Sequence, residues 1–257
     1  MRIPRSVKSV NIAGKTILLR VDFNVPIKGR QIEDDFRIKR ALPTIQMLSE
    51  QKARIVILTH LKRDSKTPSL RILSSCLRLA HIPDLKFIDD IIGSRAKQAV
   101  ASLKPGQILL LENLRRNPGE IKNSKLFARQ LAALGHIYIN EAFSVSHRKH
   151  SSIVGIPKFL PSYAGPLFLN EIKNLKRAFT PKHPFLLIVG GKKISTKAPL
   201  LQRFVNKADK IVIGGAMANT FLFAKNYGVG GRYIEGDVLG LVKKKFLSSS
   251  KFVLPLD

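Results

Sequence analysis

The sequence predicts an α/β fold that is built on doubly wound parallel sheets. Seven short runs rich in Ile, Leu and Val recur along the 257 residues, and segments of helical length separate most of them. The runs show little polar alternation, which is typical of strands that helices cover on both faces. Regular alternation of such strands with helices indicates the α/β class.

The predicted elements follow one another along the chain. The runs expected to form strands are residues 16–25, 54–60, 107–114, 136–143, 185–191, 210–217 and 251–257. Residues 37–53 and 124–135 have the pattern of helices, and we expect Gly135 to close the second one as its C-cap.

A domain boundary is expected where prolines and glycines gather. The stretch GIPKFLPSYAGP holds three prolines and two glycines, and the helical pattern LFLNEIKNLKRAF follows it. We therefore expect an N-terminal domain over residues 1–165, a connecting helix and hinge over residues 166–184, and a second α/β domain over residues 185–257.

The charge balance is strongly positive throughout. The chain has 45 Lys and Arg against 17 Asp and Glu, a net charge of +28. Residues 1–165 hold 29 of these bases and 12 of the acids, so the excess is not confined to one tail. Such a field attracts phosphates, nucleic acid or acidic small molecules without choosing among them.

Cysteine usage and hydropathy set the expected compartment. Cys76 is the one cysteine, so an internal disulfide and a cysteine metal cluster are excluded, and its amphipathic surroundings favour a packed core thiol. We expect no signal peptide and no transmembrane helix, because no apolar stretch is long enough. These features favour a reducing, cytoplasmic setting.

Polar and basic residues follow the first four strands, where ligands bind in open α/β sheets. The strand ends and their surroundings carry Arg20, Asp22, Asn24 and Arg37; His60, Lys62 and Arg63; Glu112, Asn113, Arg115 and Arg116; and Asn140, Glu141, His147 and Arg148. Arginines that converge there would bind a small polyanion, since guanidinium groups match phosphate and carboxylate oxygens. The alternative is that so basic a composition scatters arginines by chance.

The second half carries the stretch LLIVGGKKISTK. It is neither a P-loop nor a GxGxxG turn. Gly190 and Gly191 allow close backbone approach, Lys193 and Lys197 would share one side of a first helical turn, and Pro199 suits a helix start whose amides favour an anion. With a second pair, Gly214 and Gly215, after the next strand, the pattern favours a nucleotide, although either pair alone could be a tight turn.

Two facing anion sites indicate phosphoryl transfer between a nucleotide and a small acidic acceptor. The quoted motifs also resemble a known family: RVDFNVP, DDFRIKRALPTI, THLKR, LLLENLRRNPGE, INEAFSVSHRKHSSIVGIP, VGGKKISTKAPL and IGGAMANTFL occur in the order of phosphoglycerate kinase, from about residue 6 to residue 257.

The resemblance implies two Rossmann-like domains joined by a hinge that bends. The first domain would bind 3-phosphoglycerate and the second would bind the nucleotide. The implied reaction is reversible transfer between 1,3-bisphosphoglycerate and ADP in glycolysis and gluconeogenesis, by a cytoplasmic monomer. Mg²⁺ would arrive as MgADP or MgATP, with no metal ligand in this chain.

The resemblance also implies roles for individual residues. Asp22, Phe23 and Asn24 would hold the glycerate. The phosphate and carboxylate would be gripped by His60, Arg63, Arg115 and Arg148. Arg37 and Lys193 would stabilise the group in transfer from opposite sides. The nucleotide phosphate would meet Lys197, and the adenosine side would be shaped by Gly191, Gly214 and Gly215.

The sequence departs from the family pattern at several positions, which are Lys62, Asp64, Glu141, Ser144, Val145, Ser146, Lys192 and Thr196. It also stops at KFVLPLD, before the family's ribose-binding stretch, its Gly-Gly-Asp-Thr loop and the segment that returns to the first domain. We therefore expect an incomplete second domain, and weak or no activity from a chain of this extent. The alternative function is that of a basic, non-catalytic protein that binds RNA or another polyanion. The small number of aromatic residues and the lack of a recognised nucleic-acid module argue against it.

Overall fold

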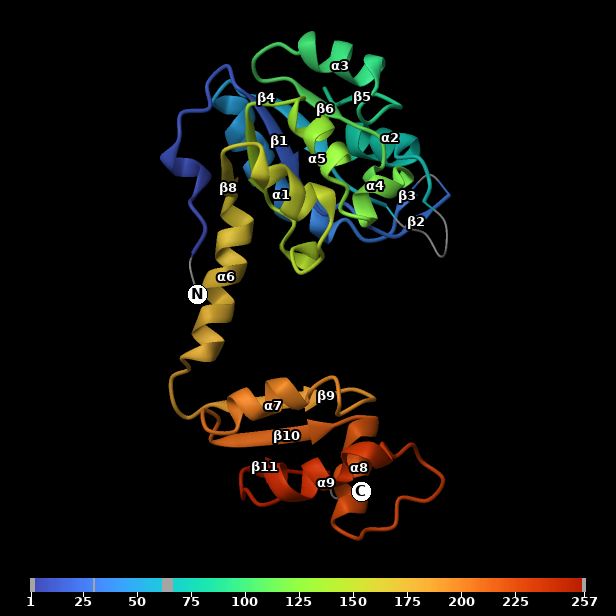
Figure 1. Cartoon of the computed structure of the whole chain (residues 1–257), viewed down its shortest axis with the longest axis vertical. Helices are drawn as coiled ribbons and strands as arrows, with labels where there is room; N and C mark the ends of the chain where they lie inside the picture. Colours follow the sequence, from blue (N-terminus) through green and yellow to red (C-terminus); the bar gives the residue numbers. More distant parts are fainter. Residues whose placement is uncertain (1–2, 30, 62–66, 256–257) are drawn as a thin grey trace. The chain divides into compact units, whose positions relative to one another are not determined.

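The chain divides into two units, residues 1–173 and 174–257, each with its own parallel sheet (Figure 1). A computed structural model describes residues 3–29, 31–61 and 67–255. The division falls inside helix α6 (Pro166–Phe179), the segment expected to connect two domains. The roles assigned to the two domains stay a prediction.

The first unit is built around a six-stranded parallel sheet in the order β5-β6-β4-β1-β7-β8. Its strands are β1 (Thr16–Arg20), β4 (Arg54–Leu58), β5 (Lys86–Phe87), β6 (Ile108–Leu110), β7 (Ile137–Asn140) and β8 (Ser162–Ala164). Its helices are α1 (Phe36–Glu50), α2 (Arg71–Ala80), α3 (Ser94–Ala101), α4 (Pro118–Ile121), α5 (Lys125–Ala132) and α6. A short hairpin, β2 (Ile27–Lys28) and β3 (Gln31–Ile32), follows β1.

Helices cover both faces of this sheet, which explains the lack of polar alternation in its strands. Ile17 and Leu19 of β1 pack into a core with residues of α1 and α2. Leu18, between them, packs on the other side with residues of α3 and α5. Strand β1 is completely buried because it pairs with β4 on one side and β7 on the other.

The second unit has three parallel strands in the order β11-β10-β9. They are β9 (Leu186–Gly190), β10 (Lys210–Gly214) and β11 (Phe252–Val253), and the helices are α7 (Ala198–Phe204), α8 (Ala216–Ala224) and α9 (Leu239–Leu241). Strand β10 pairs beside β9, and β11 pairs on the far side of β10, so the sheet grows in one direction. Right-handed crossovers then place the connecting helices on one face of the sheet.

One face of this second sheet is consequently packed and the other is open. Val189, Ile211 and Ile213 point into a core with side chains of α7 and α8. On the opposite face, Leu186 is 53% and Ile188 is 70% exposed.

The predicted fold class is confirmed, and each of the seven predicted strands contains an observed one. The strands are shorter than expected, because the polar residues at their ends lie in loops. Strands β5 and β8 and the hairpin were not predicted. The C-cap prediction is wrong: α5 ends at Ala132 with Ala133 as its cap. Gly135 is required for packing, since a Cβ there would lie 2.6 Å from Cγ of Leu18.

Candidate functional site

A cavity of about 430 Å³ opens at the carboxyl ends of the strands in the first unit. The residues that line it are Asp22, Asn24, Arg37, His60, Arg115, Ser144, Val145 and Arg148. They come from the segments after β1, β4, β6 and β7 and from the start of α1. The chain switches direction beside β1, since β4 pairs on one side and β7 on the other, and such a switch point is where open α/β sheets bind ligands.

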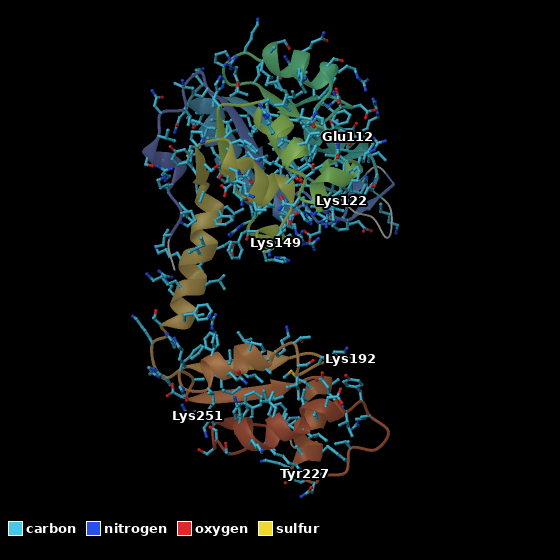
Figure 2. All side chains as sticks on the ribbon, viewed as in Figure 1. Glu112, Lys122, Lys149, Lys192, Tyr227 and Lys251 are labelled. Atoms are coloured by element: carbon cyan, nitrogen blue, oxygen red, sulfur yellow. The ribbon has the colours of Figure 1, made fainter. Side chains whose placement is uncertain are left out.

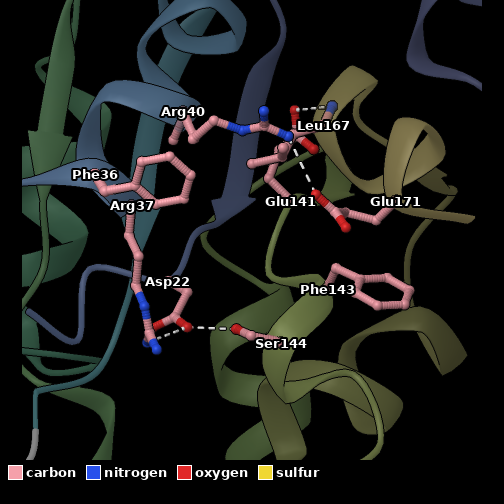
Figure 3. A pocket seen from close by; sticks show the side chains of 10 residues that line it. Asp22, Phe36, Arg37, Arg40, Glu141, Phe143, Ser144, Leu167 and Glu171 are labelled. Atoms are coloured by element: carbon pink, nitrogen blue, oxygen red, sulfur yellow. Dashed lines mark hydrogen bonds and ion pairs between the residues drawn. The ribbon is translucent and has the colours of Figure 1, made fainter. Parts of the chain in front are cut away.

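Arg37 is held at the mouth of this cavity by Asp22. Its Nη1 donates to Oδ2 of Asp22 at 2.8 Å and to the carbonyl oxygen of Asn24 at 3.3 Å. The hydroxyl of Ser144 donates to the same Oδ2, and Figure 3 shows the three side chains meeting at that atom. Asp22 also accepts from the amide of Asn24 at 3.1 Å, so both of its oxygens are fixed.

The remaining cations of the cavity repel one another. The pKa of Arg115 is lowered by burial and then by the positive charges of Arg148 and Arg20. Asp22 is the one carboxylate among the lining residues, and it is already paired with Arg37. An anion that enters therefore relieves repulsion between arginines, and two or three oxygens on it can be bound at once.

His60 is an uncharged member of this wall. It is buried, and burial lowers its pKa to about 2, with the charges of Arg20, Arg115 and Arg148 acting in the same direction. At neutral pH the ring is a neutral hydrogen-bonding group and contributes no charge to the cavity.

A second cavity of about 410 Å³ adjoins the first and shares Asp22, Arg37 and Ser144 with it. Its lining is mostly apolar, with Phe36 and Phe143 on its walls, and an ion pair between Arg40 and Glu171 at 3.1 Å crosses it (Figure 3).

Glu141 lines this second cavity and caps α6. Its carboxylate accepts from the amides of Leu167 at 3.2 Å and Phe168 at 2.8 Å and from the hydroxyl of Thr44. Burial raises the pKa of Glu141, although these hydrogen bonds act to lower it. Glu141, one of the departures from the family pattern, thus places its carboxylate under the start of α6.

The predicted residues of the first unit do not all reach the cavity. The side chain of Phe23 is fully buried in the core, because alternation along the chain directs Asp22 and Asn24 outward and Phe23 inward. The structure therefore gives no support to a ligand contact from the Phe23 side chain. Arg63, together with Lys62 and Asp64, lies outside the described residues.

Other strand-end residues organise loops. Arg116 pairs with Glu112 at 2.8 Å, and Glu112 also accepts from the amide of Leu70 at 2.7 Å. Asn113 binds the backbone of Leu61. His147 is exposed and is not among the lining residues.

In the second unit the two glycine pairs lie side by side. Gly190 and Gly214 are partners in register at the ends of β9 and β10. Gly191 has φ of 143° and Gly215 has φ of 65°, and a Cβ on Gly215 would lie 3.1 Å from the backbone of Gly191. Glycine is thus required at this corner both by conformation and by space.

The lysines of the second unit lie just before α7. Lys193 is exposed in the loop, and Lys197 directly precedes the helix. The prediction that both lie in the first helical turn is wrong, because that turn starts at Ala198. Helix α7 also offers few free donors, since the Ala198 amide donates to the carbonyl of Ile194 at 2.7 Å and Pro199 has none.

Glu235 holds this loop, and the sequence analysis missed it. Its carboxylate accepts from the amides of Ile194 at 2.6 Å and Ser195 at 3.1 Å and from the hydroxyl of Ser195 at 2.5 Å. Burial acts to raise the pKa of Glu235, but these bonds and the charge of Lys193 bring it below its ordinary value. The segment GRYIEGD has no pattern that would reveal this contact.

Basic side chains are distributed over both units, with Lys122 and Lys149 on the first and Lys192 on the second (Figure 2). The amine of Lys192 lies 4.9 Å from the ring centre of Tyr233. Within the described residues, no group of three His, Cys, Asp or Glu side chains is arranged to hold a metal ion, and no helix is long and apolar enough to cross a membrane.

Comparisons with known proteins identify the family of this chain. The family described as Phosphoglycerate kinase matches residues 7–257. The phosphoglycerate kinase of Pelotomaculum thermopropionicum is 40% identical over 98% of this chain and 67% of its own length, and that of Rhizobium meliloti is 44% identical over 96% and 64%.

Solved structures resemble the chain equally well. The phosphoglycerate kinase from Coxiella burnetii superposes with a TM-score of 0.85 at 35% identity, covering 97% of this chain and 65% of its own. The enzyme from Pyrococcus horikoshii gives 0.85 at 28% identity, covering 98% and 67%. The chain thus spans about two thirds of the length of the relatives it matches. By these matches and this fold, it belongs to the phosphoglycerate kinase family.

Proposed function

We propose that this chain contributes to phosphoryl transfer between 1,3-bisphosphoglycerate and ADP, giving 3-phosphoglycerate and ATP in glycolysis and its reversal. The observation that carries the proposal is the 430 Å³ cavity, in which Arg37, Arg115 and Arg148 surround His60, Asp22 and Asn24. That set of cations and polar groups suits a small molecule with a phosphate, a carboxylate and a hydroxyl.

The roles of the residues follow from their chemistry. Arg115 and Arg148 bind phosphate or carboxylate oxygens, and Asp22 and Asn24 orient the glycerate hydroxyl and carboxylate region. Arg37, now paired with Asp22, would exchange that partner for the phosphoryl oxygens when the ligand is bound. The acyl phosphate is already activated, so positioning and charge stabilisation suffice and no protein nucleophile is required.

The lysine and glycine corner of the second unit is proposed to bind the nucleotide. Lys193 would stabilise the group in transfer, Lys197 would bind a nucleotide phosphate, and Gly191, Gly214 and Gly215 would shape the adenosine side. This set of lysine amines and close backbone fits the phosphates of a nucleotide. Mg²⁺ would be carried in by the nucleotide phosphates and would neutralise their charge.

The finer parts of the proposal concern setting and motion. We place the chain in the cytoplasm as a monomer, in keeping with its single, buried Cys76. Donor and acceptor must meet for transfer, so bending about residues 166–184 is proposed as the motion that brings them together.

The test is calorimetric titration of the 257-residue chain with 3-phosphoglycerate. We expect saturable 1:1 binding, and Arg115→Ala or Arg148→Ala should weaken it about tenfold or more through loss of a charged hydrogen bond. Arg129→Ala, at an exposed position on α5, is the matched control and should leave binding unchanged. Absence of binding at millimolar ligand, or equal effects from all three variants, would overturn the proposal.

A second candidate function rests on the net charge of +28. A polyanion-binding protein would take up RNA with an affinity that falls steeply as salt rises. If RNA binds in this manner, and 3-phosphoglycerate neither binds nor competes, the polyanion function replaces the kinase proposal.

A further inference from the structure

A buried cation lies beneath the floor of the 430 Å³ cavity. Arg20, at the end of β1, is 1% exposed and is among the largest fully buried side chains. Its Nε donates to Oγ of Ser152 at 3.0 Å, one Nη donates to the carbonyl oxygen of Val21, and the other lies 3.1 Å from Nδ1 of His60.

The contact with Arg20 decides which nitrogen of His60 carries the proton. A guanidinium has five N–H donors and no acceptor, so Nδ1 of His60 must be the acceptor. The proton of the neutral ring then lies on Nε2. Since His60 lines the cavity, Nε2–H is the polar group that the ring has left to offer a ligand.

A buried carboxylate keeps Arg20 in this position. The amide and hydroxyl of Ser152 both donate to Glu120, at 2.9 and 2.5 Å. Because the Ser152 hydroxyl gives its proton to Glu120, its lone pair is open to Nε of Arg20. The charge of Glu120 favours the charged form of Arg20, which burial alone would penalise.

The groups around His60 also exclude its charged form. Arg20 from β1, Arg115 after β6 and Arg148 after β7 are cations, and His150 precedes the turn that carries Ser152. Two acidic groups accompany them: Glu120 lies against Ser152 and His150, and Asp22 lines the same cavity, where it is paired with Arg37. A proton on Nδ1 would face the Arg20 guanidinium at hydrogen-bond distance.

We propose that Arg20 is a positioning residue that locks His60 as a neutral Nε2–H donor toward an oxygen of the bound phosphate or carboxylate. The ligand part of this statement rests on the proposed function; the fixed tautomer does not. The residue acts through His60 and has no need to touch the ligand itself.

The direct test is nitrogen-15 NMR of the histidine rings in the intact chain, with the His60 signals assigned from a His60→Asn variant. We expect the Nε2–H tautomer with no protonation step from pH 8 to pH 5. His136, whose Nδ1 accepts from the amide of Thr16 at 3.0 Å, gives the reference pattern for that tautomer at pH 8. A proton on Nδ1, or a charged ring within this range, overturns the inference.

A pair of variants separates positioning from a merely structural role. Arg20→Met leaves Glu120 buried without its cation, so Arg20→Met is combined with Glu120→Gln to restore neutrality. In a folded double variant, His60 should show mixed tautomers or protonate above pH 5, and affinity for 3-phosphoglycerate should fall about tenfold. Glu120→Gln alone is the comparison variant: its side-chain amide oxygen can still accept from Ser152, and Arg20 keeps its contacts with Ser152, Val21 and His60, so His60 should retain the Nε2–H form.

The two failures are distinguishable. If the wild-type chain binds no 3-phosphoglycerate while His60 shows the fixed tautomer, the proposed function fails and the role of Arg20 toward His60 remains. If 3-phosphoglycerate binds while His60 titrates freely, the inference fails and the proposed function remains. A double variant that is folded and keeps the wild-type tautomer also overturns the inference.

Discussion

At the scale of single residues, Oδ2 of Asp22 is the atom that links the side chains of the candidate site. It accepts from Arg37 and from Ser144, while Oδ1 accepts from a backbone amide. If Arg37 moves to a phosphoryl oxygen, Ser144 still donates to Asp22. The hydroxyl therefore keeps the carboxylate oriented while its cation is engaged elsewhere.

Ser144→Ala tests this role. The variant leaves Asp22 without a side-chain donor once Arg37 has moved, so we expect 3-phosphoglycerate to bind about three- to tenfold more weakly. Calorimetry measures the change. Ser146→Ala in the same turn removes only a bond to the carbonyl of Phe143 and should leave affinity as it is. Unchanged binding in Ser144→Ala would show that Asp22 is oriented without this hydroxyl.

His60 predicts a pH dependence of stability. Its pKa is about 2 in the folded chain, while the unfolded chain protonates near the ordinary value of 6.5. Below pH 6.5 the unfolded state binds more protons than the folded state. The contribution of His60 to the free energy of unfolding is therefore fully present above that pH and is lost as the pH decreases, by up to about 1.4 kcal/mol per pH unit. Denaturant unfolding should show a shallower slope in His60→Asn, with His147→Asn as the control substitution. Parallel slopes for wild type and His60→Asn would contradict the burial argument.

Much of the site could be predicted at this scale, and the exceptions have physical reasons. Arginines after the strands were expected, but Arg115 and Arg116 are neighbours in a tight turn and face different partners. Sequence alone does not show that Glu112 takes Arg116 away from the cavity. The burial of Arg20 was equally hidden, because its counter-charge lies one hundred positions later, at Glu120.

Among the elements, α6 depends on a cap from outside its own sequence. Glu141, which follows β7, accepts hydrogen bonds from the first amides of the helix. The capping carboxylate belongs to the same loop that carries Ser144 and Arg148 to the cavity. The start of the connecting helix and the wall of the cavity are thus built from one segment.

Glu141→Ala should lower the free energy of unfolding of the chain by about 2 kcal/mol, since it leaves two helix amides and the Thr44 hydroxyl without this acceptor. Hydrogen exchange at the amides of Leu167 and Phe168 should accelerate. Glu171→Ala on the same helix breaks a half-exposed ion pair and should cost less than about 1 kcal/mol. Similar losses in both variants would argue against a capping role.

The lysine loop before α7 depends in the same way on Glu235. Glu235→Ala should speed hydrogen exchange at Ile194 and Ser195 about tenfold or more, because each amide loses its acceptor. Nucleotide affinity should fall as Lys193 loses its fixed position. Asp237→Ala, two residues away and exposed, is the control. Protection that persists in Glu235→Ala would mean that the loop is held by other contacts.

Elements were predictable where burial leaves a long apolar run. The central strands of the first sheet are covered on both faces, so their sequences are continuous apolar runs that predict strands. Strands β5 and β8, at the two edges of that sheet, have only two and three residues and give no period to detect. Helix α7 was anticipated from Pro199, which does lie in its first turn.

At the scale of the whole molecule, the two units differ in how well they cover their sheets. The first sheet has helices on both faces. The second, because its strands are added in one direction, leaves Leu186, Ile188 and Val253 exposed on one face. An exposed apolar sheet face attracts other apolar surfaces.

Ile188→Lys should therefore reduce binding of a hydrophobic dye such as ANS and weaken any self-association seen by sedimentation. Ile188 is 70% exposed, so the charge should cost little stability. Leu79→Lys on α2, at a side chain that is 89% exposed, is the matched control and should change neither measurement. Equal dye binding by wild type and Ile188→Lys would show that this face is covered in solution.

The floor of the cavity joins parts of the chain that are far apart in sequence. Arg20 meets Ser152 and Asp22 meets Ser144, 132 and 122 positions later. Contacts this distant form late, because a long loop must close before any of them is made. During synthesis, a nascent chain on the ribosome would hold Arg20 long before its partner Ser152 had emerged. Retention of the growing polypeptide on a phosphate resin should therefore begin abruptly, at the chain length that first places residue 152 outside the ribosome.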